Sequence, residues 1–316
     1  MIELLVQNKA DGRIYEISEI VSAISFSDSL NNGCSKLEFT YLHSGTVFTN
    51  GSIVRFRYNG ANIFYGYIFS YESGADNEVG AVAYDQLRYL KAKDSFGIKN
   101  ISIGELTRII AGALKLRVGK LDETGYILPS KVIDNQTYLD TIYDGISSTL
   151  LDTGRKYAFY DSFGSLMLTD LKSMRLPLVL GDESLAYGYK YGQSIDENTY
   201  NRIIIRKKAG ESGQTTRIIE EDGGSFGKYG ILQYYESAED SANEGQLREK
   251  AKALLWLLNR ETRSLSLEAL GDTRVRAGNS ILASISGLDV PQYLIVSDCK
   301  HTFGANNHTM SLELIL

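Results

Sequence analysis

The chain has 316 residues, of which 43% are hydrophobic and 23% charged, as in ordinary globular proteins with room for two or three domains. A net charge of -6, a sequence pI of about 5.3 and scattered lysines and arginines argue against specific nucleic-acid binding. No segment approaches the roughly 20 apolar residues that span a bilayer, and no secretory signal is recognisable, so we expect cytoplasmic synthesis without membrane insertion.

Cysteine and tyrosine usage indicates a β-rich intracellular protein. Cys34 and Cys299 lie in strand-like contexts far apart, and in a reducing compartment we expect two half-buried thiols. The chain has 21 tyrosines and 11 phenylalanines but one tryptophan and three prolines. Tyrosine favours strands and suits protein interfaces, so a plain β-rich fold and an interface-rich one both explain the excess.

Residues 1–96 predict short strands separated by Gly, Asn and Asp turns. In the clearest segment, alternating apolar residues at 53–58 and 63–71 flank Asn59-Gly60. An Asn-Gly pair between two such runs is a strong hairpin signal. Several strands at this spacing predict an N-terminal β-barrel-like domain, ending in one helical turn after Tyr84.

Residues 97–177 change to the helical period. Ser102 with Glu105 forms a capping box before one amphipathic helix, and Thr137 with Asp140 begins a second that ends at Gly154. A hairpin is predicted to follow, turning at residues 161–164. Two helices and a hairpin make a small α+β module between β-rich regions.

Residues 178–316 predict strands again, with one amphipathic helix at 243–259 and a polar loop at 209–214. Glycine-rich residues 223–230 lack the Gly-Lys-Ser/Thr ending of a phosphate-binding loop, so we expect a mobile loop there. The apolar run around Trp256 suggests burial of the helix on more than one side, for example by a neighbouring subunit.

The last 52 residues alternate between apolar and polar positions, which indicates strands with one buried face. Turn residues interrupt the alternation at 271–272, 287–291 and 304–307. The overall prediction is a mainly β fold with an α+β insertion, divided into domains at 1–96, 97–177 and 178–316.

Few side chains offer catalytic or metal chemistry. Cys299, His301 and His308 could converge across a hairpin, but zinc prefers four ligands and the spacing offers no fourth. No Gly-x-Ser-x-Gly motif is present. The 39 acidic residues leave a pair of carboxylates of the glycosidase kind open. We therefore name no catalytic, cofactor-binding or metal-binding residue and predict no cofactor.

Several segments resemble the XkdQ/YqbQ family of phage tail proteins, baseplate hub components of contractile tails and tail-like bacteriocins (tailocins) that are similar to late control protein D. The resemblance lies in ordered segments spread over the chain, at 83–94, 199–207, 228–233, 243–259, 271–278 and 301–314. Characteristic stretches are KYGILQ, GDTRVRAG and HTMSLEL.

The resemblance implies two related antiparallel β-barrels of the tail-tube type, one on each side of the module. A homotrimer would then form a pseudo-sixfold ring that adapts a hexameric tail tube to a trimeric central spike. The implied partners are the tube, the spike, the tape-measure protein and other baseplate proteins, after synthesis in the bacterial cytoplasm and assembly into a virion or tailocin. The resemblance implies no enzyme; a tail-associated peptidoglycan hydrolase and a receptor- or carbohydrate-binding tail module stay open as alternatives.

Overall fold

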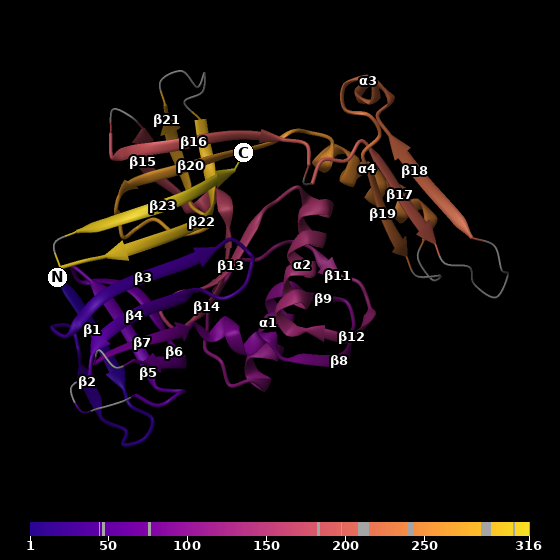
Figure 1. The fold of residues 1–316 in the computed structure, drawn as a ribbon. Helices are drawn as coiled ribbons and strands as arrows, with labels where there is room; N and C mark the ends of the chain where they lie inside the picture. The colour runs from indigo at the N-terminus through magenta and orange to yellow at the C-terminus, as the bar shows by residue number, and fades with distance from the viewer. Residues whose placement is uncertain are drawn as a thin grey trace. The chain divides into compact units, whose positions relative to one another are not determined.

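The computed structural model describes residues 1–43, 45, 48–74, 77–181, 184–196, 198–207, 215–238, 243–285, 292–305 and 307–315. The loop predicted at 209–214 and the turn at 287–291 lie outside these residues. Contacts divide the chain into two compact units, with residues 1–190 and 265–315 in the first and 191–264 in the second (Figure 1). No helix in the described ranges has the length and apolar character to cross a membrane.

The N-terminal strands share one hydrophobic core in the first unit. They are β1 (Ile2–Gln7), β2 (Ile14–Glu16), β3 (Val21–Ser29), β4 (Lys36–Leu42), β5 (Ile53–Tyr58), β6 (Ala61–Ser73) and β7 (Glu78–Tyr84). They pair in the order β3-β4-β7-β6-β5-β1-β2. The predicted hairpin is confirmed: β5 and β6 pair across Asn59 and Gly60, which both have positive φ as a tight turn of this hand requires.

The predicted module contains both helices and the hairpin. The helical turn predicted after Tyr84 is η1 (Gln86–Lys91), and β8 (Lys93–Ile98) leads into the module. The elements that follow are β9 (Ile101–Ser102), α1 (Ile103–Ala113), β10 (Val118–Leu121), β11 (Ile127–Leu128), β12 (Lys131–Thr137), α2 (Tyr138–Thr153), β13 (Tyr157–Asp161), β14 (Leu166–Asp170) and η2 (Leu171–Met174). The capping box at Ser102 is complete, and the Thr137 hydroxyl accepts the Asp140 amide. The β8–β12 pair and the parallel β10–β14 pair were not predicted, because they join distant segments.

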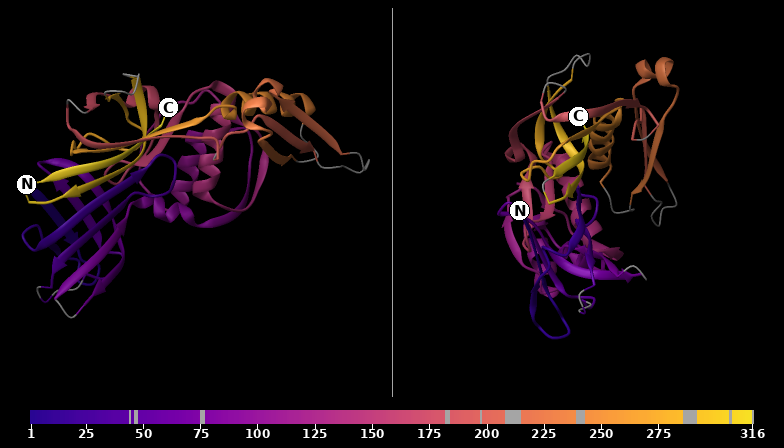
Figure 2. Two further views of the ribbon diagram at one scale, coloured as in Figure 1. Left: turned by 45° about the horizontal axis from the view of Figure 1, so that its top comes forward. Right: turned by 60° about the vertical axis from the view of Figure 1, so that its left-hand side comes forward.

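The C-terminal strands of the chain continue the same sheet. They are β15 (Arg175–Gly181), β16 (Ala186–Ser194), β20 (Thr262–Leu270), β21 (Ser280–Ser284), β22 (Gln292–Phe303) and β23 (His308–Ile315). Beyond a register shift between Val296 and Asp298, β22 pairs antiparallel with β3, so that Cys299 faces Asp28 and Phe303 faces Ile24. Figure 2 shows these yellow strands beside the indigo ones.

The mainly β fold with an α+β insertion is confirmed, but the two closed barrels are not found. Instead, N- and C-terminal strands form one 13-stranded sheet whose pairing path runs from β16 to β2. Within the described residues, no pairing joins the ends of this path. The physical reason is the length of β22: its first half pairs with β21, and its second half reaches β3.

The second unit is a three-stranded sheet with a helix against it. Its elements are β17 (Arg202–Lys207), β18 (Thr216–Glu221), η3 (Gly223–Ser225), α3 (Phe226–Tyr229), β19 (Gln233–Ala238) and α4 (Glu244–Leu258). The prediction of a mobile loop at 223–230 is wrong, because Asp222 caps a helical turn there.

The division into domains at residues 97 and 178 stays a prediction.

Candidate functional site: the Arg276 network and the exposed surfaces

The loop from Gly271 to Gly278, which is the GDTRVRAG stretch, carries Arg276 into the interior of the first unit. The Asn279 side chain fixes this loop by accepting the Arg276 amide at 2.7 Å and donating to the Met174 carbonyl at 2.9 Å. The Arg276 guanidinium lies over the ring of Tyr160, 3.7 Å from its centroid. The loop therefore places a cation among residues from distant parts of the chain.

The guanidinium bonds to one buried carboxylate and one backbone carbonyl, and Ser35 links that carboxylate to Asp85. Arg276 Nη2 donates to Asp28 on β3 at 2.9 Å, and its Nη1 donates to the carbonyl of Asp161 at the end of β13 at 3.2 Å. Ser35 donates its hydroxyl to Asp28 and its amide to Asp85, both at 2.9 Å. The network thus joins the N-terminal strands, the α+β module and the C-terminal loop.

Burial controls the protonation of this network. It raises the pKa of Asp85 far above 3.8, and the neighbouring Asp161 carboxyl raises it further. Burial also raises the pKa of Asp161 to about 6. Asp161 nevertheless accepts the Gln86 side chain and the Gly164 amide, each at 2.7 Å. Asp85 and Asp161 thus have hydrogen-bond partners within the chain, which is typical of a structural polar network.

A small cavity adjoins the network. Its volume is about 100 Å³, and its lining includes Asp85, Asp161, Arg276, His301 and Phe303. Ligand pockets usually measure roughly 300–1,000 Å³. Within the described residues, the buried Arg276 Nε atom has no hydrogen-bond partner. The cavity is too small for a polysaccharide strand, so it lends no support to a hydrolase site.

The histidines considered as metal ligands contact each other and the backbone. The β22–β23 hairpin places His301 Nδ1 2.9 Å from His308 Nε2, and His301 Nε2 lies 3.0 Å from the Val275 carbonyl oxygen. In the described part of the chain, no three His, Cys, Asp or Glu side chains are grouped to hold a metal ion. Cys299 is a buried free thiol, and Cys34 is a half-buried one whose pKa burial raises to about 11.

The buried His301 makes stability depend on pH. Burial lowers the pKa of His301 to about 4 from its ordinary 6.5, and His308 adds to this. Between pH 6.5 and 4 the unfolded chain therefore binds a proton at His301 that the folded chain does not. Acidification through this range lowers the free energy of unfolding by up to about 3 kcal/mol. The raised pKa of Asp161 acts in the opposite direction between about pH 4 and 6.

We expect the wild-type chain to lose more stability than a His301→Gln variant when the pH falls from 6.5 to 4. Between pH 6.5 and 4, the unfolding free energy of the wild type should fall by about 3 kcal/mol more than that of the variant. Urea titrations at a series of pH values measure it. Parallel pH profiles would show that His301 does not titrate as its burial requires.

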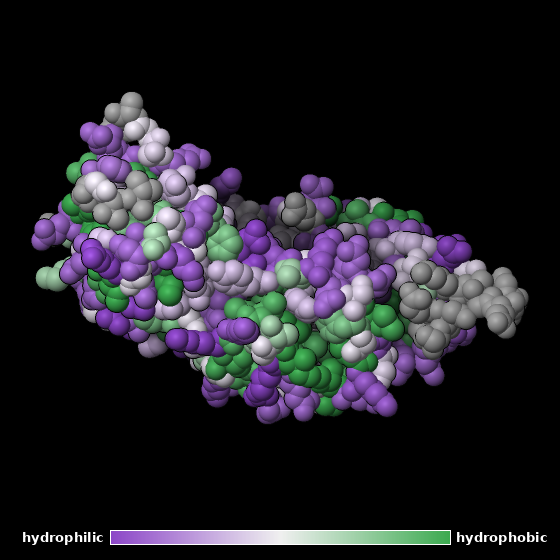
Figure 3. Space-filling view, turned by 90° about the horizontal axis from the view of Figure 1, so that it is seen from below, coloured by the Kyte–Doolittle hydropathy of each residue, from purple (hydrophilic) through white to green (hydrophobic). Residues whose placement is uncertain are grey.

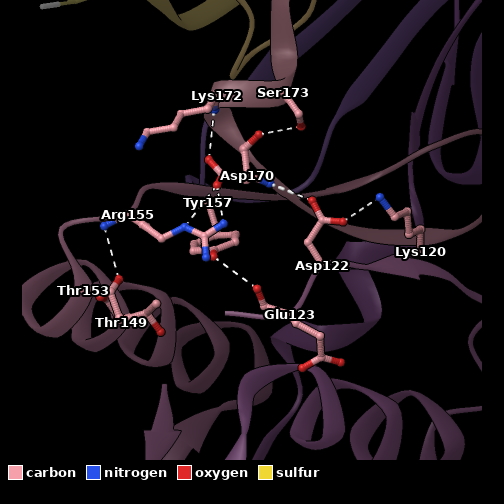
Figure 4. Close-up of polar contacts among 10 residues, drawn as sticks. All are labelled: Lys120, Asp122, Glu123, Thr149, Thr153, Arg155, Tyr157, Asp170, Lys172 and Ser173. Carbon is pink, nitrogen blue, oxygen red and sulfur yellow. Dashed lines mark hydrogen bonds and ion pairs between the residues drawn. The ribbon is translucent and has the colours of Figure 1, made fainter. Parts of the chain in front are cut away.

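Figure 4 shows a second polar cluster, at the end of α2 and beside β14. Arg155 Nη2 donates to Asp170 at 2.6 Å, and Asp122 accepts the Asp170 amide at 3.0 Å and pairs with Lys120 at 2.8 Å. Burial raises the pKa of Asp170, but hydrogen bonds from the Lys172 amide and Arg155 more than offset this and hold it below 3.8. Such a carboxylate is a poor general base, and the cluster joins α2 to the strands.

Exposed apolar side chains mark surfaces available to other proteins. Figure 3 shows hydrophobic side chains gathered on the face seen from below. In the α+β module the exposed ones are Ile109, Ile127 and Val132. On β16, at one end of the sheet path, Tyr187, Tyr189 and Tyr191 are exposed at alternating positions. An edge strand with one exposed aromatic face is suited to contact another protein.

The helix α4 buries one face only. Leu247, Ala251 and Leu254 are buried, whereas Trp256 is 80% exposed. The predicted burial on a second side is therefore not provided by this chain, and burial by a neighbouring subunit stays a prediction. Exposed tryptophans are unusual, and buried ones are often the main anchors of interfaces.

Sequence reasoning missed the network because nothing local marks Asp28, Asp85 or Asp161 as buried. Two of its members could have been found, since Asp85 and Arg276 lie inside the stretches AYDQLRYLKAKD and GDTRVRAG. The stretches that contain Asp85 and Arg276 come together only in the folded chain.

Comparisons with known proteins match nearly the whole chain. The family profile described as YQBQ-like matches residues 24–315. The chain is 29% identical to "Uncharacterized protein YqbQ" of Bacillus subtilis over 86% of this chain and 83% of that one. It is 28% identical to "Phage-like element PBSX protein XkdQ" of the same bacterium, over 84% and 82%. The structure of the 43 kDa tail protein of prophage MuSo2 from Shewanella oneidensis superposes with a TM-score of 0.71 at 12% identity, covering 99% and 98%.

Proposed function

Because the chain belongs to the YQBQ-like family, we propose that it is a structural protein of a phage tail or phage-tail-like particle and forms the hub of its baseplate. The observation that carries the proposal is the agreement of fold with a prophage tail protein along 99% of the chain. The named relative from a phage-like element supports the same particle class.

The fold suggests how such a hub works. Each chain contributes an N-terminal and a C-terminal group of strands, joined in one sheet through β22 and β3. Three chains in a ring would present six groups of strands, which matches a sixfold tail tube on one side and a threefold spike on the other. Symmetry adaptation is the proposed mechanism, and it requires no reaction.

The chemistry of the interior agrees with a structural role. The charged clusters around Arg276 and Asp170 are hydrogen-bonded within the chain, and the adjoining cavity is small. Such networks rigidify a fold and fix its arrangement. A rigid ring is what a hub under mechanical load needs.

Co-expression tests the proposal. A tagged form of this chain, expressed with the tube and spike proteins of the same particle, is expected to co-purify with both. Three copies per spike trimer are the expected ratio. A chain that binds neither partner would contradict the hub assignment.

Trp256 provides a second test, of the contact between subunits or with another baseplate protein. We expect Trp256→Asp to change the unfolding free energy of the isolated chain by less than about 0.5 kcal/mol, because the side chain is exposed. Incorporation into complexes should fall at least about tenfold, as for an interface anchor. Arg260→Asp, on an exposed residue beyond α4, is the control. Normal assembly of the Trp256 variant would count against burial of this residue in the particle.

A further inference from the structure

A row of aromatic side chains with arginines between them lies on the outer face of β6. Tyr65, Tyr67 and Phe69 alternate with core residues along the strand and are half-buried. Tyr65 and Tyr67 contact each other, and Tyr67 and Phe69 both contact Tyr89 on η1, with ring centroids 5.3–6.1 Å apart. The rings form a continuous, partly exposed surface.

The arginines on this surface lack carboxylate partners. Arg55 lies 5.8 Å from the centroid of Tyr65, and Arg88 lies 5.3 Å from that of Phe69. Arg117 is close enough to Tyr67 to influence its pKa. In the described ranges none of the three forms an ion pair, whereas the neighbouring Arg57 pairs with Glu3. We call Arg55, Arg88, Arg117 and the four rings the arginine–aromatic face.

A surface of opposite charge lies on α2 and the β8–β12 pair. Asp94, Asp140 and Asp144 are exposed. Each accepts a hydrogen bond from a neutral side chain, respectively Tyr138, Thr137 and Gln136. The helix α2 contains no lysine or arginine. We call these three carboxylates the acidic face. Lys93 and Ser95, the hydrogen-bond partner of Asp134, point to the other side of β8, so Lys93 and Asp134 lie outside this face.

The strands of the arginine–aromatic face lie apart from the acidic face, whereas η1, which carries Arg88 and Tyr89, contacts α2. Figure 1 shows β5 and β6 on one side of the first unit, and α2, β8 and β12 on the other. A closed ring of identical chains needs two different, mutually complementary surfaces on each chain. One chain with an unpaired cationic face and an unpaired acidic face meets this requirement.

We propose that the arginine–aromatic face of one copy binds the acidic face of the next copy. The inference rests on the proposed ring and names the contact that closes it. Arginines held over aromatic rings are already oriented, so they lose little freedom when carboxylates approach. Charge complementarity between the faces favours a second copy over any partner whose surface is not acidic.

Charge reversal on either face tests this contact. We expect Arg55→Glu with Arg88→Glu, and separately Asp94→Arg with Asp144→Arg, to weaken ring formation at least tenfold in light-scattering titrations. The variant with all four substitutions should regain it. Arg260→Glu with Arg263→Glu changes the same charge in the second unit and should leave assembly unchanged. Circular dichroism confirms that each variant folds.

Mixing the two double variants adds a geometric test. Each fits only an unlike neighbour, and a three-membered ring cannot have unlike neighbours at all three contacts. The mixture should therefore form pairs but no trimers. Raising the salt concentration should also weaken the wild-type ring.

The outcomes separate the contact from the ring itself. If the wild type is trimeric and the double variants still form trimers, the proposed contact is wrong but the proposed ring is not. A wild-type chain that forms no ring under any condition, with or without its spike protein, would overturn both. Loss of spike binding without loss of the trimer, on reversal of the arginines, would assign that face to a different protein.

Discussion

Replacing Arg276 by Met is expected to lower the free energy of unfolding by about 3–5 kcal/mol, because it leaves the buried Asp28 carboxylate without its cation. Asp28 is 5% exposed, and its other hydrogen bond comes from a neutral hydroxyl, that of Ser35. The loss also removes the contact with Tyr160. Chemical denaturation at fixed protein concentration measures the effect.

The same loop provides a matched control. Arg274 pairs with Asp272 two residues away, and its side chain is 57% exposed. Exposed pairs contribute less than about 1 kcal/mol, so Arg274→Met should change stability by no more than that. Equal effects of the two substitutions would contradict the assignment of Arg276 as the centre of the network.

The second large effect is expected at Gly66, in the middle of β6. A Cβ atom there would lie 2.3 Å from the Tyr84 carbonyl oxygen and 2.4 Å from the Phe64 ring. The carbonyl belongs to the paired strand β7 and cannot move without breaking the sheet. Gly66→Ala should therefore cost about 3 kcal/mol, the upper end for overpacked sites, as measured by thermal or chemical unfolding.

Gly112, in the last turn of α1, is the control for this substitution. A Cβ atom at Gly112 meets nothing within 4 Å. Alanine is the better helix former, so Gly112→Ala should raise stability by about 0.5–1 kcal/mol. A Gly66 variant as stable as the wild type would mean that β6 and β7 are spaced differently.

Local signals in the sequence predicted local structure well. The hydroxyls of Ser102 and Thr137 begin α1 and α2 because each can accept an amide three residues later. Asn59 and Gly60 determine the β5–β6 hairpin in an equally local way, because the positive φ angles of the turn are a property of those two residues.

Long-range pairing could not be read in this way. The alternation in β22 predicts which side chains are buried. It does not predict that the second half of β22 pairs with β3, where Cys299 faces Asp28, 271 residues earlier in the chain. Strand partners depend on the whole sheet. Two closed barrels were therefore the wrong expectation, although the strands themselves were found.

The site depended on the same long-range information. In the sequence Asp85 looks like an ordinary turn residue after a strand. In the fold its side chain is buried and accepts a hydrogen bond from the Ser35 amide, 50 residues away. The apolar run around Trp256 suggested two buried faces of α4, but Leu247, Ala251 and Leu254 account for the only face that this chain buries among its described residues. Interfaces between chains leave no short motif in sequence.

The mass of the purified protein, alone and with its candidate spike protein, tests the hub proposal most directly. Light scattering should give three times the chain mass of 35.1 kDa, and negative-stain images of the same fraction should show rings with a central hole. A protein that remains monomeric in concentrated solution, and still does so after the spike and tube proteins are added, would contradict the account.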